Sequence, residues 1–97
     1  MLSAAQEAVK RISYEIHKKE IYTSGFFITL LAEQIGQVAE KYLKEGRHGK
    51  DIDVDIADII VASLAYLNWL EKDASAAFQK ALEKHEKAFK QSKEQKK

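Results

Sequence analysis

Two pairs of polar side chains, each spaced three residues apart, are the features of this sequence best suited to chemistry. Gln34 and Gln37 form the first pair, and Asp55 and Asp58 form the second. Residues at i and i+3 share one face of a helix, so each pair would act as a unit. Both pairs lie beside strongly apolar sequence, where an unpaired polar group is costly. Helical bundles hold metal ions between helices in this way, and oxygen ligands of this kind suit Mg²⁺.

A structural explanation of the same pairs stays open. Asp55 and Asp58 would also be favoured by the helix dipole if they lay near the start of a helix. Gln34 and Gln37 would then form a neutral hydrogen-bonded contact between two helices, with no metal between them.

The elements that position these pairs are predicted to be four helices. Apolar residues recur at helical spacing over about 3–19, 26–44 and 51–70, and again from 74 onward. Ser3 is a possible N-cap for the first helix. Breaks are expected at 22–25, at the glycine-bearing loop 46–50 and at 71–73. Four helices with short connections predict an all-α four-helix bundle.

The segment from Asp51 to Ile56 alternates polar and apolar residues, which on its own favours a strand. The apolar sequence that follows, up to Leu70, is too long and too uniform for a strand, and no second strand is predicted to pair with it. We therefore predict a helix here, capped by Asp51 or Asp53. Because it is apolar nearly all round past its first turn, we expect it to be the buried centre of the bundle.

Composition limits the classes of function. The 97 residues suit one domain, with a core over about 3–89 and a polar tail over 90–97. A net charge of +1 gives no general attraction to nucleic acid or to membranes, and no apolar run is long enough to span a bilayer. The chain lacks cysteine and shows no signal-peptide core, so we expect a cytoplasmic protein. A chain this short would gain stability from oligomerisation.

The two polar pairs and their surroundings carry a resemblance to a known family. The segments 31–40 (LAEQIGQVAE) and 55–60 (DIADII) resemble the MazG family of all-α nucleotide pyrophosphohydrolases. That family carries Glu-Glu-x-x-Glu on one helix and Glu-x-x-Asp on the next. The similarity extends over roughly residues 20 to 89. It implies a MazG-type four-helix domain that forms a homodimer or homotetramer.

The resemblance also implies a reaction, the Mg²⁺-dependent hydrolysis of a nucleoside triphosphate to the monophosphate and pyrophosphate. Gln34, Gln37, Asp55 and Asp58 fall at the metal-binding positions, and Glu33 and Asp58 at positions that would serve catalysis. Two of the four expected metal-binding acids are therefore amides here. An amide oxygen is a neutral ligand and cannot act as a base, so we expect hydrolysis to be impaired.

Basic residues could contact the phosphates of such a substrate. Arg47 and Lys50 lie in the loop between the two polar pairs, and Lys84 lies in the last predicted helix. Solvation of loop and helix-end charges explains the same residues. The lysines of the last helix lack interleaved aromatic residues, so we expect no nucleic-acid partner.

The sequence thus predicts a MazG-like nucleoside triphosphate pyrophosphohydrolase with a weakened magnesium site. Two alternatives remain. One is a member of the same fold that binds nucleotide or a protein partner without catalysis. The other is a purely structural helical oligomer, in which the amide and carboxylate pairs only form hydrogen bonds.

Overall fold

A computed structural model describes residues 1–12 and 23–95, and within these ranges the chain forms helices and no strand. The helices are α1 (Ser3–Ile12), α3 (Ser24–Glu45), α4 (Ile52–Trp69) and α5 (Ala74–Gln95). The expected all-α class is confirmed. The predicted extension of the first helix to residue 19 lies outside the described residues, as does residue 22 of the first predicted break. Ser3 is itself the first residue of α1, so it lies inside the helix and not at a flanking cap position.

The second predicted helix begins and ends at local signals. Thr23 is the N-cap of α3, and its hydroxyl oxygen accepts a hydrogen bond from the Phe26 amide at 3.4 Å. The helix therefore starts two residues earlier than the glycine at position 25 suggested. It stops at Gly46, whose φ of 83° is a left-handed conformation that favours glycine.

The segment with alternating polarity is helical, as predicted. Asp51 occupies the N-cap position of α4 in a left-handed conformation, with φ of 57°, but its side chain makes no capping hydrogen bond. Asp53 and Asp55 lie in the first turn, where carboxylates interact favourably with the helix dipole. The first residues of α4 are therefore helical although their alternating polarity favours a strand, because they continue into a long helix that packs on α3.

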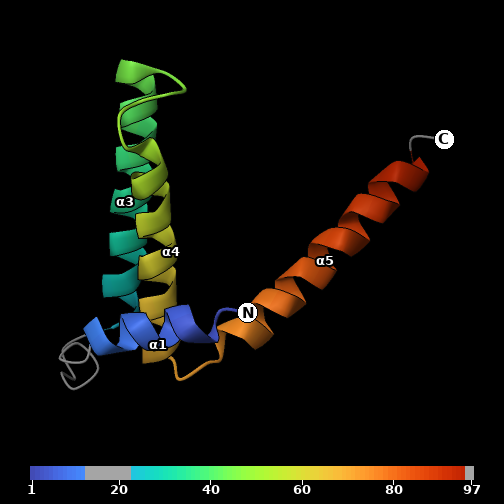
Figure 1. Cartoon of the computed structure of the whole chain (residues 1–97). Helices are drawn as coiled ribbons and strands as arrows, with labels where there is room; N and C mark the ends of the chain where they lie inside the picture. The colour runs from blue at the N-terminus through green and yellow to red at the C-terminus, as the bar shows by residue number, and fades with distance from the viewer. Residues whose placement is uncertain (13–22, 96–97) are drawn as a thin grey trace.

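The helices α3 and α4 pack side by side as an antiparallel hairpin, α1 crosses the base of this hairpin, and α5 leaves the base at a wide angle (Figure 1). The core lies at the base. Phe27 is almost fully buried there, its ring stacked on Tyr66 at 5.1 Å and tilted against Trp69 at 5.5 Å. The other buried residues of this cluster are Val9, Leu64, Ala65 and Ala74, and Ala62 of α4 is buried as well.

The end of the hairpin near its connecting loop and most of α5 have fewer neighbouring helices than the helices of a compact four-helix bundle. α5 meets the other helices only near its first turn, and it stays helical to Gln95, beyond the expected start of a polar tail at residue 90. The prediction that α4 past its first turn is the buried centre of the bundle is wrong for its first half, because Ile56, Ile60 and Val61 are exposed. Along most of its length α4 has only α3 as a neighbour, so these side chains lie in solvent. None of the described helices is long and apolar enough to cross a membrane.

Candidate functional site

The hairpin places the two polar pairs on its two adjacent helices. Gln34 and Gln37 lie on α3, and Asp55 and Asp58 lie on α4. Gln34 is half-buried, and its side-chain oxygen Oε1 is buried without a hydrogen-bond partner. Asp55 is also half-buried, whereas Gln37 and Asp58 are exposed. One amide and one carboxylate therefore face the interior of the hairpin, and one of each lies at its surface.

Asp55 forms an ion pair with Lys41, a residue that the sequence analysis did not single out. The Lys41 ammonium group also donates a hydrogen bond to the Lys50 carbonyl oxygen at 2.7 Å. The hydrogen bond to Asp55 raises the pKa of Lys41 above its ordinary value, although partial burial opposes this. A signal was present in the sequence, because Lys41 follows Gln34 by seven residues and so lies on the same face of α3.

A shallow hollow of about 320 Å³ lies where this ion pair meets the surface. It is lined by residues of α3 and by Asp55 of α4: Gln37, Glu40, Lys41, Lys44, Glu45 and Asp55. Lys44 donates a hydrogen bond to Glu40 at 2.7 Å, which lowers the pKa of Glu40 and raises that of Lys44. The hollow thus joins one predicted amide ligand, one predicted carboxylate ligand and two ammonium groups.

The loop between the helices sets the position of Lys41. Gly49 is buried, and a Cβ atom at this residue would lie 2.9 Å from Cγ of Lys41. No side chain fits here unless Lys41 moves, because Cγ lies near the rigid end of that side chain. Gly49 therefore allows the lysine to pass under the loop and reach Asp55.

Other predicted site residues lie apart from this hollow. Glu33 is exposed on α3, and Arg47 and Lys50 are exposed in the loop, where the Lys50 backbone and not its side chain contacts Lys41. Lys84 lies on α5, which leaves the hairpin at its base. Within one chain, α5 therefore does not bring Lys84 to the hollow.

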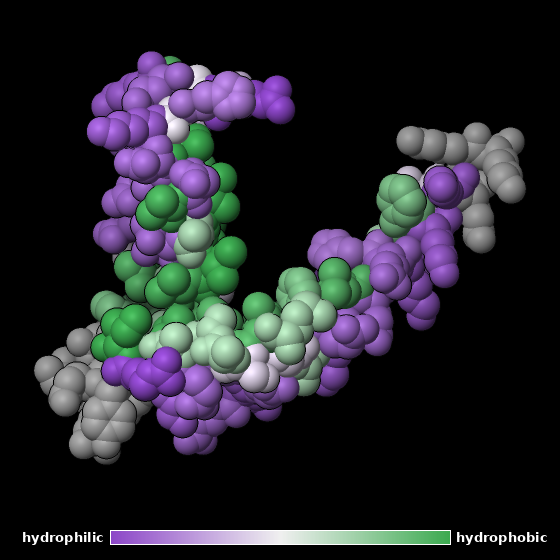
Figure 2. Space-filling model, in the orientation of Figure 1, coloured by the Kyte–Doolittle hydropathy of each residue, from purple (hydrophilic) through white to green (hydrophobic). Residues whose placement is uncertain are grey.

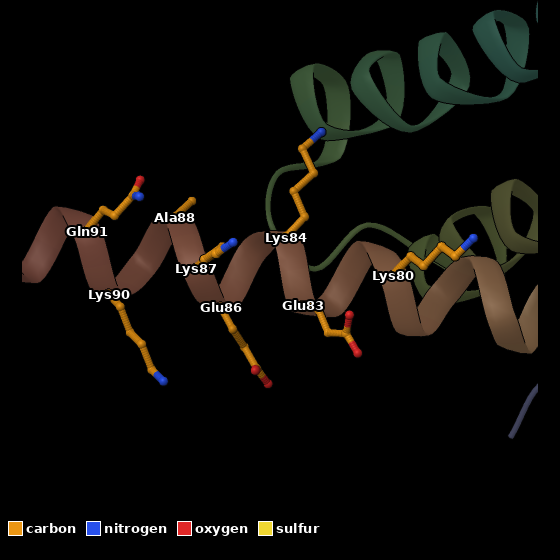
Figure 3. Close-up of a pocket in the computed structure, with 8 residues that line it drawn as sticks. All are labelled: Lys80, Glu83, Lys84, Glu86, Lys87, Ala88, Lys90 and Gln91. Carbon is orange, nitrogen blue, oxygen red and sulfur yellow. The ribbon is translucent and has the colours of Figure 1, made fainter.

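The surface around Lys84 is not a converging site. A space of about 760 Å³ is bordered by residues 80 to 91 of α5. Their side chains leave this single helix in different directions, with Lys84 and Gln91 on one side and Glu83, Glu86 and Lys90 on the other (Figure 3). A second surface would be needed to complete a binding site here.

Two carboxylates on one face of α4, those of Asp55 and Asp58, would suit a magnesium ion bound together with phosphate, but not a closed protein cage. Among the described residues, no three His, Cys, Asp or Glu side chains come together as a metal cluster. Mg²⁺ needs only one or two protein carboxylates when waters and substrate phosphates supply the other ligands. Asp55 and Asp58 could provide these carboxylates, and Gln34, whose Oε1 is buried without a hydrogen-bond partner, lies two turns before Lys41 on α3.

Comparisons of this chain with protein-family models, with curated proteins and with solved structures find no match.

Proposed function

We propose that the hairpin of α3 and α4 binds a magnesium–nucleoside triphosphate, and that the chain is a slow nucleotide pyrophosphohydrolase of the MazG type. The observation that carries this proposal is the buried, unpaired Oε1 of Gln34. A buried acceptor without a partner is costly, and such atoms often mark a place where a ligand binds. Gln34 lies one helical turn from Gln37, which lines the hollow with Asp55 and Lys41.

The proposed roles follow from the chemistry of each side chain. Asp55 and Asp58 would hold the metal, with Gln34 and Gln37 as neutral oxygen ligands. Bound Mg²⁺ would neutralise phosphate charge and lower the pKa of a bound water. Lys41 and Lys44 would contact phosphate oxygens from the rim of the hollow.

A proton must leave the water that attacks the substrate, because hydrolysis to the monophosphate and pyrophosphate consumes one water molecule. Asp58 is the proposed acceptor, and Glu33, exposed one turn before Gln37 on α3, would accept the proton if the bound water lay on that side of the hollow. Arg47 and Lys50 would add cationic contacts to the phosphates from the loop, and Lys84 would do so only from the α5 of another copy in the proposed oligomer. Gln34 and Gln37 cannot carry the negative charge that the family places at their positions, so we expect turnover to be slow.

A second candidate function is nucleotide binding without hydrolysis. The ion pair between Lys41 and Asp55 favours it, because the ammonium group already compensates one of the two carboxylates. The same pair would suit a purely structural oligomer. In each case we propose that the chain works as a homodimer or homotetramer, and the nucleotide-binding functions would place it in the cytoplasm.

Calorimetric titration with a panel of nucleoside triphosphates, with and without Mg²⁺, tests these proposals together with an assay of pyrophosphate release. We expect Mg²⁺-dependent binding that is lost in Asp58→Asn. The matched control is Asp53→Asn, which removes another exposed acid from the start of α4 and should leave binding unchanged. Binding without pyrophosphate release supports the second candidate. No binding to any triphosphate overturns both.

Restoring the missing charges gives a further test. Gln34→Glu and Gln37→Glu should each strengthen Mg²⁺ binding, by roughly tenfold or more for each restored carboxylate, about 1.4 kcal/mol. Circular dichroism should confirm an unchanged helix content. If neither substitution improves Mg²⁺ binding, the metal site proposed for these positions is wrong.

A further inference from the structure

The chain exposes far more surface than a compact protein of its size. Its accessible surface is 7816 Å², whereas a compact monomer of 97 residues exposes about 5,600 Å². Its radius of gyration is 16.4 Å, against about 12.5 Å for a compact chain. The excess of about 2,200 Å² per chain, or about 4,400 Å² for two chains, falls within the range of area that obligate dimer interfaces bury.

Part of the exposed apolar surface lies on two faces that border the same open angle. Figure 2 shows hydrophobic side chains along the side of the hairpin that overlooks α5, and along the side of α5 that is turned toward the hairpin. On the hairpin the exposed apolar residues include Ile28, Ile35 and Tyr42, which share one face of α3, and Ile56 and Ile60, which share one face of α4. On α5 they are Phe78, Leu82 and Phe89.

Each face includes a seam, which here means a stripe of side chains spaced alternately four and three residues apart along one helix, as found between packed helices. On α3 the exposed seam has spacings of four, three, four and three residues, with large and small side chains alternating: Ile28, Ala32, Ile35, Ala39 and Tyr42. On α5 the seam has spacings of four, three and four: Phe78, Leu82, His85 and Phe89. Repeats that average 3.5 residues keep one stripe facing a partner helix. Among residues 1–12 and 23–95, which the structure describes, neither seam has such a partner helix.

Residues 70–73 form the corner between α4 and α5, and hydrogen bonds from α1 hold this corner and the start of α5 in place. While these bonds persist, α5 cannot fold back to cover the hairpin of its own chain. The Gln6 side chain of α1 donates to the Lys72 carbonyl at 2.7 Å and accepts from the Ala74 amide at 2.8 Å. The Leu2 amide donates to the Ser75 hydroxyl at 2.9 Å. Because α1 itself packs on the hairpin base, these contacts hold the first turn of α5 in its outward direction.

The charges of the two faces are complementary. The hairpin, residues 24–69, carries seven acidic and four basic side chains, a net charge of −3. α5, residues 74–95, carries five lysines and three glutamates, a net charge of +2. Placing α5 of one chain on the hairpin of another therefore brings opposite charges together, and this favours association and orients it.

From these observations we infer that two copies of this chain form a dimer by exchange, in which the α5 seam of each copy packs on the α3 seam of the other. The arrangement is a two-fold interface in which each chain both gives and receives a helix. It places the α5 helix of the other copy beside the described helices α1, α3 and α4. The inference does not depend on nucleotide binding, because it rests on surface, seams and charge alone.

The test begins with the molar mass of the wild-type protein, measured by light scattering or sedimentation equilibrium with no nucleotide present. We expect the molar mass of a dimer or of a tetramer made of two dimers. A monomer would overturn the inference, whether its scattering radius were compact, with α5 folded back, or extended.

Two substitutions then locate the interface. Leu82→Asp on α5 and Ile35→Asp on α3 should each weaken the dimer by roughly 30-fold or more, the effect of a central interface residue. The control is Gln79→Asp, which lies on another face of α5 and should dimerise like the wild type. Helix content by circular dichroism shows whether each variant is folded. A wild-type dissociation constant for Ile35→Asp would overturn the inference, because the dimer would then not use the α3 seam.

Mixing the two variants separates exchange from other arrangements. In an exchanged dimer of one Leu82→Asp chain with one Ile35→Asp chain, one seam contact is fully wild type and the other carries both substitutions. The mixed dimer should therefore be tighter than either variant alone. If the mixed dimer is no tighter than the dimer of either variant alone, α5 does not pack on the α3 seam of the other chain.

Discussion

The ammonium group of Lys41 on α3 forms an ion pair with the carboxylate of Asp55 on α4, at the position where the sequence predicts a metal ligand. This pair joins the two helices near the loop that connects them, because Lys41 also donates a hydrogen bond to the Lys50 carbonyl. Asp55 therefore has a cationic partner within the chain. Any metal that binds Asp55 must compete with Lys41 or share the carboxylate with it.

We predict that removing Lys41 changes metal and nucleotide binding in opposite directions. In Lys41→Met the Asp55 carboxylate loses its cation, so Mg²⁺ alone should bind several-fold more tightly. A nucleoside triphosphate should bind more weakly, because a phosphate contact is lost. Calorimetric titration measures both. Lys44→Met is the matched control, since Lys44 pairs with Glu40 and should leave Mg²⁺ affinity unchanged. Unchanged Mg²⁺ affinity in Lys41→Met would contradict a role for Asp55 as ligand.

The stabilising effect of the Lys41 charge should disappear at high pH. The hydrogen bond to Asp55 raises the pKa of Lys41 in the folded chain above the ordinary value of 10.5. A raised pKa contributes stability that is fully present below pH 10.5 and is lost as the pH rises through the folded pKa. The difference in unfolding free energy between wild type and Lys41→Met should therefore be constant from pH 7 to about 10 and should shrink above that. Urea unfolding at a series of pH values measures it, and a difference that grows with pH would show that the ion pair is not stabilising.

Two glycines should respond in opposite ways to alanine. In Gly49→Ala the new Cβ would displace Lys41, so we expect a loss of about 1–3 kcal/mol, the usual cost of overpacking. In Gly36→Ala the new Cβ would meet no atom within 4 Å, in the middle of α3, so we expect a gain of about 0.5–1 kcal/mol. Thermal and urea unfolding followed by circular dichroism measure both. Equal effects would mean that Gly49 does not position Lys41.

The Gln6 side chain should contribute to stability through the corner between α4 and α5. Gln6→Ala removes its bonds to the Lys72 carbonyl and the Ala74 amide, and a partly buried amide loses its partner. We expect a loss of about 1–3 kcal/mol. Urea unfolding can be followed through the fluorescence of Trp69, the one tryptophan, which packs on the core at this end of the hairpin. The neighbouring Glu7→Ala, which is exposed, serves as the control and should change stability little.

Local signals predicted the helices and most of their ends, because helical hydrogen bonds and turns join residues that are close in the chain. The breaks at Gly46 and Glu71 fall where expected, since both residues adopt left-handed conformations that interrupt a helix. Two features were not predicted. α5 stays helical to Gln95, and α4 exposes apolar side chains such as Ile60.

The candidate site was predicted only in part. The positions of Gln34 and Asp55 on adjacent helices follow from periodicity, and the structure places them in one hairpin. The pairing of Asp55 with Lys41 and the buried, unpaired oxygen of Gln34 are details of side-chain packing that no spacing specifies. Glu33 and Lys84 share the expected chemistry, but the hairpin and α5 leave them apart from the hollow.

The sequence by itself therefore determined which segments are helical, where they stop and which faces are apolar, because these properties arise within a few turns of chain. Only the tertiary structure decided how the apolar faces are used. The hydrogen bonds of Gln6 with residues 72 and 74 set the direction of α5, and with that direction α5 does not pack along the hairpin. Contacts between residues more than sixty positions apart depend on how the helices pack together, which helical periodicity does not specify.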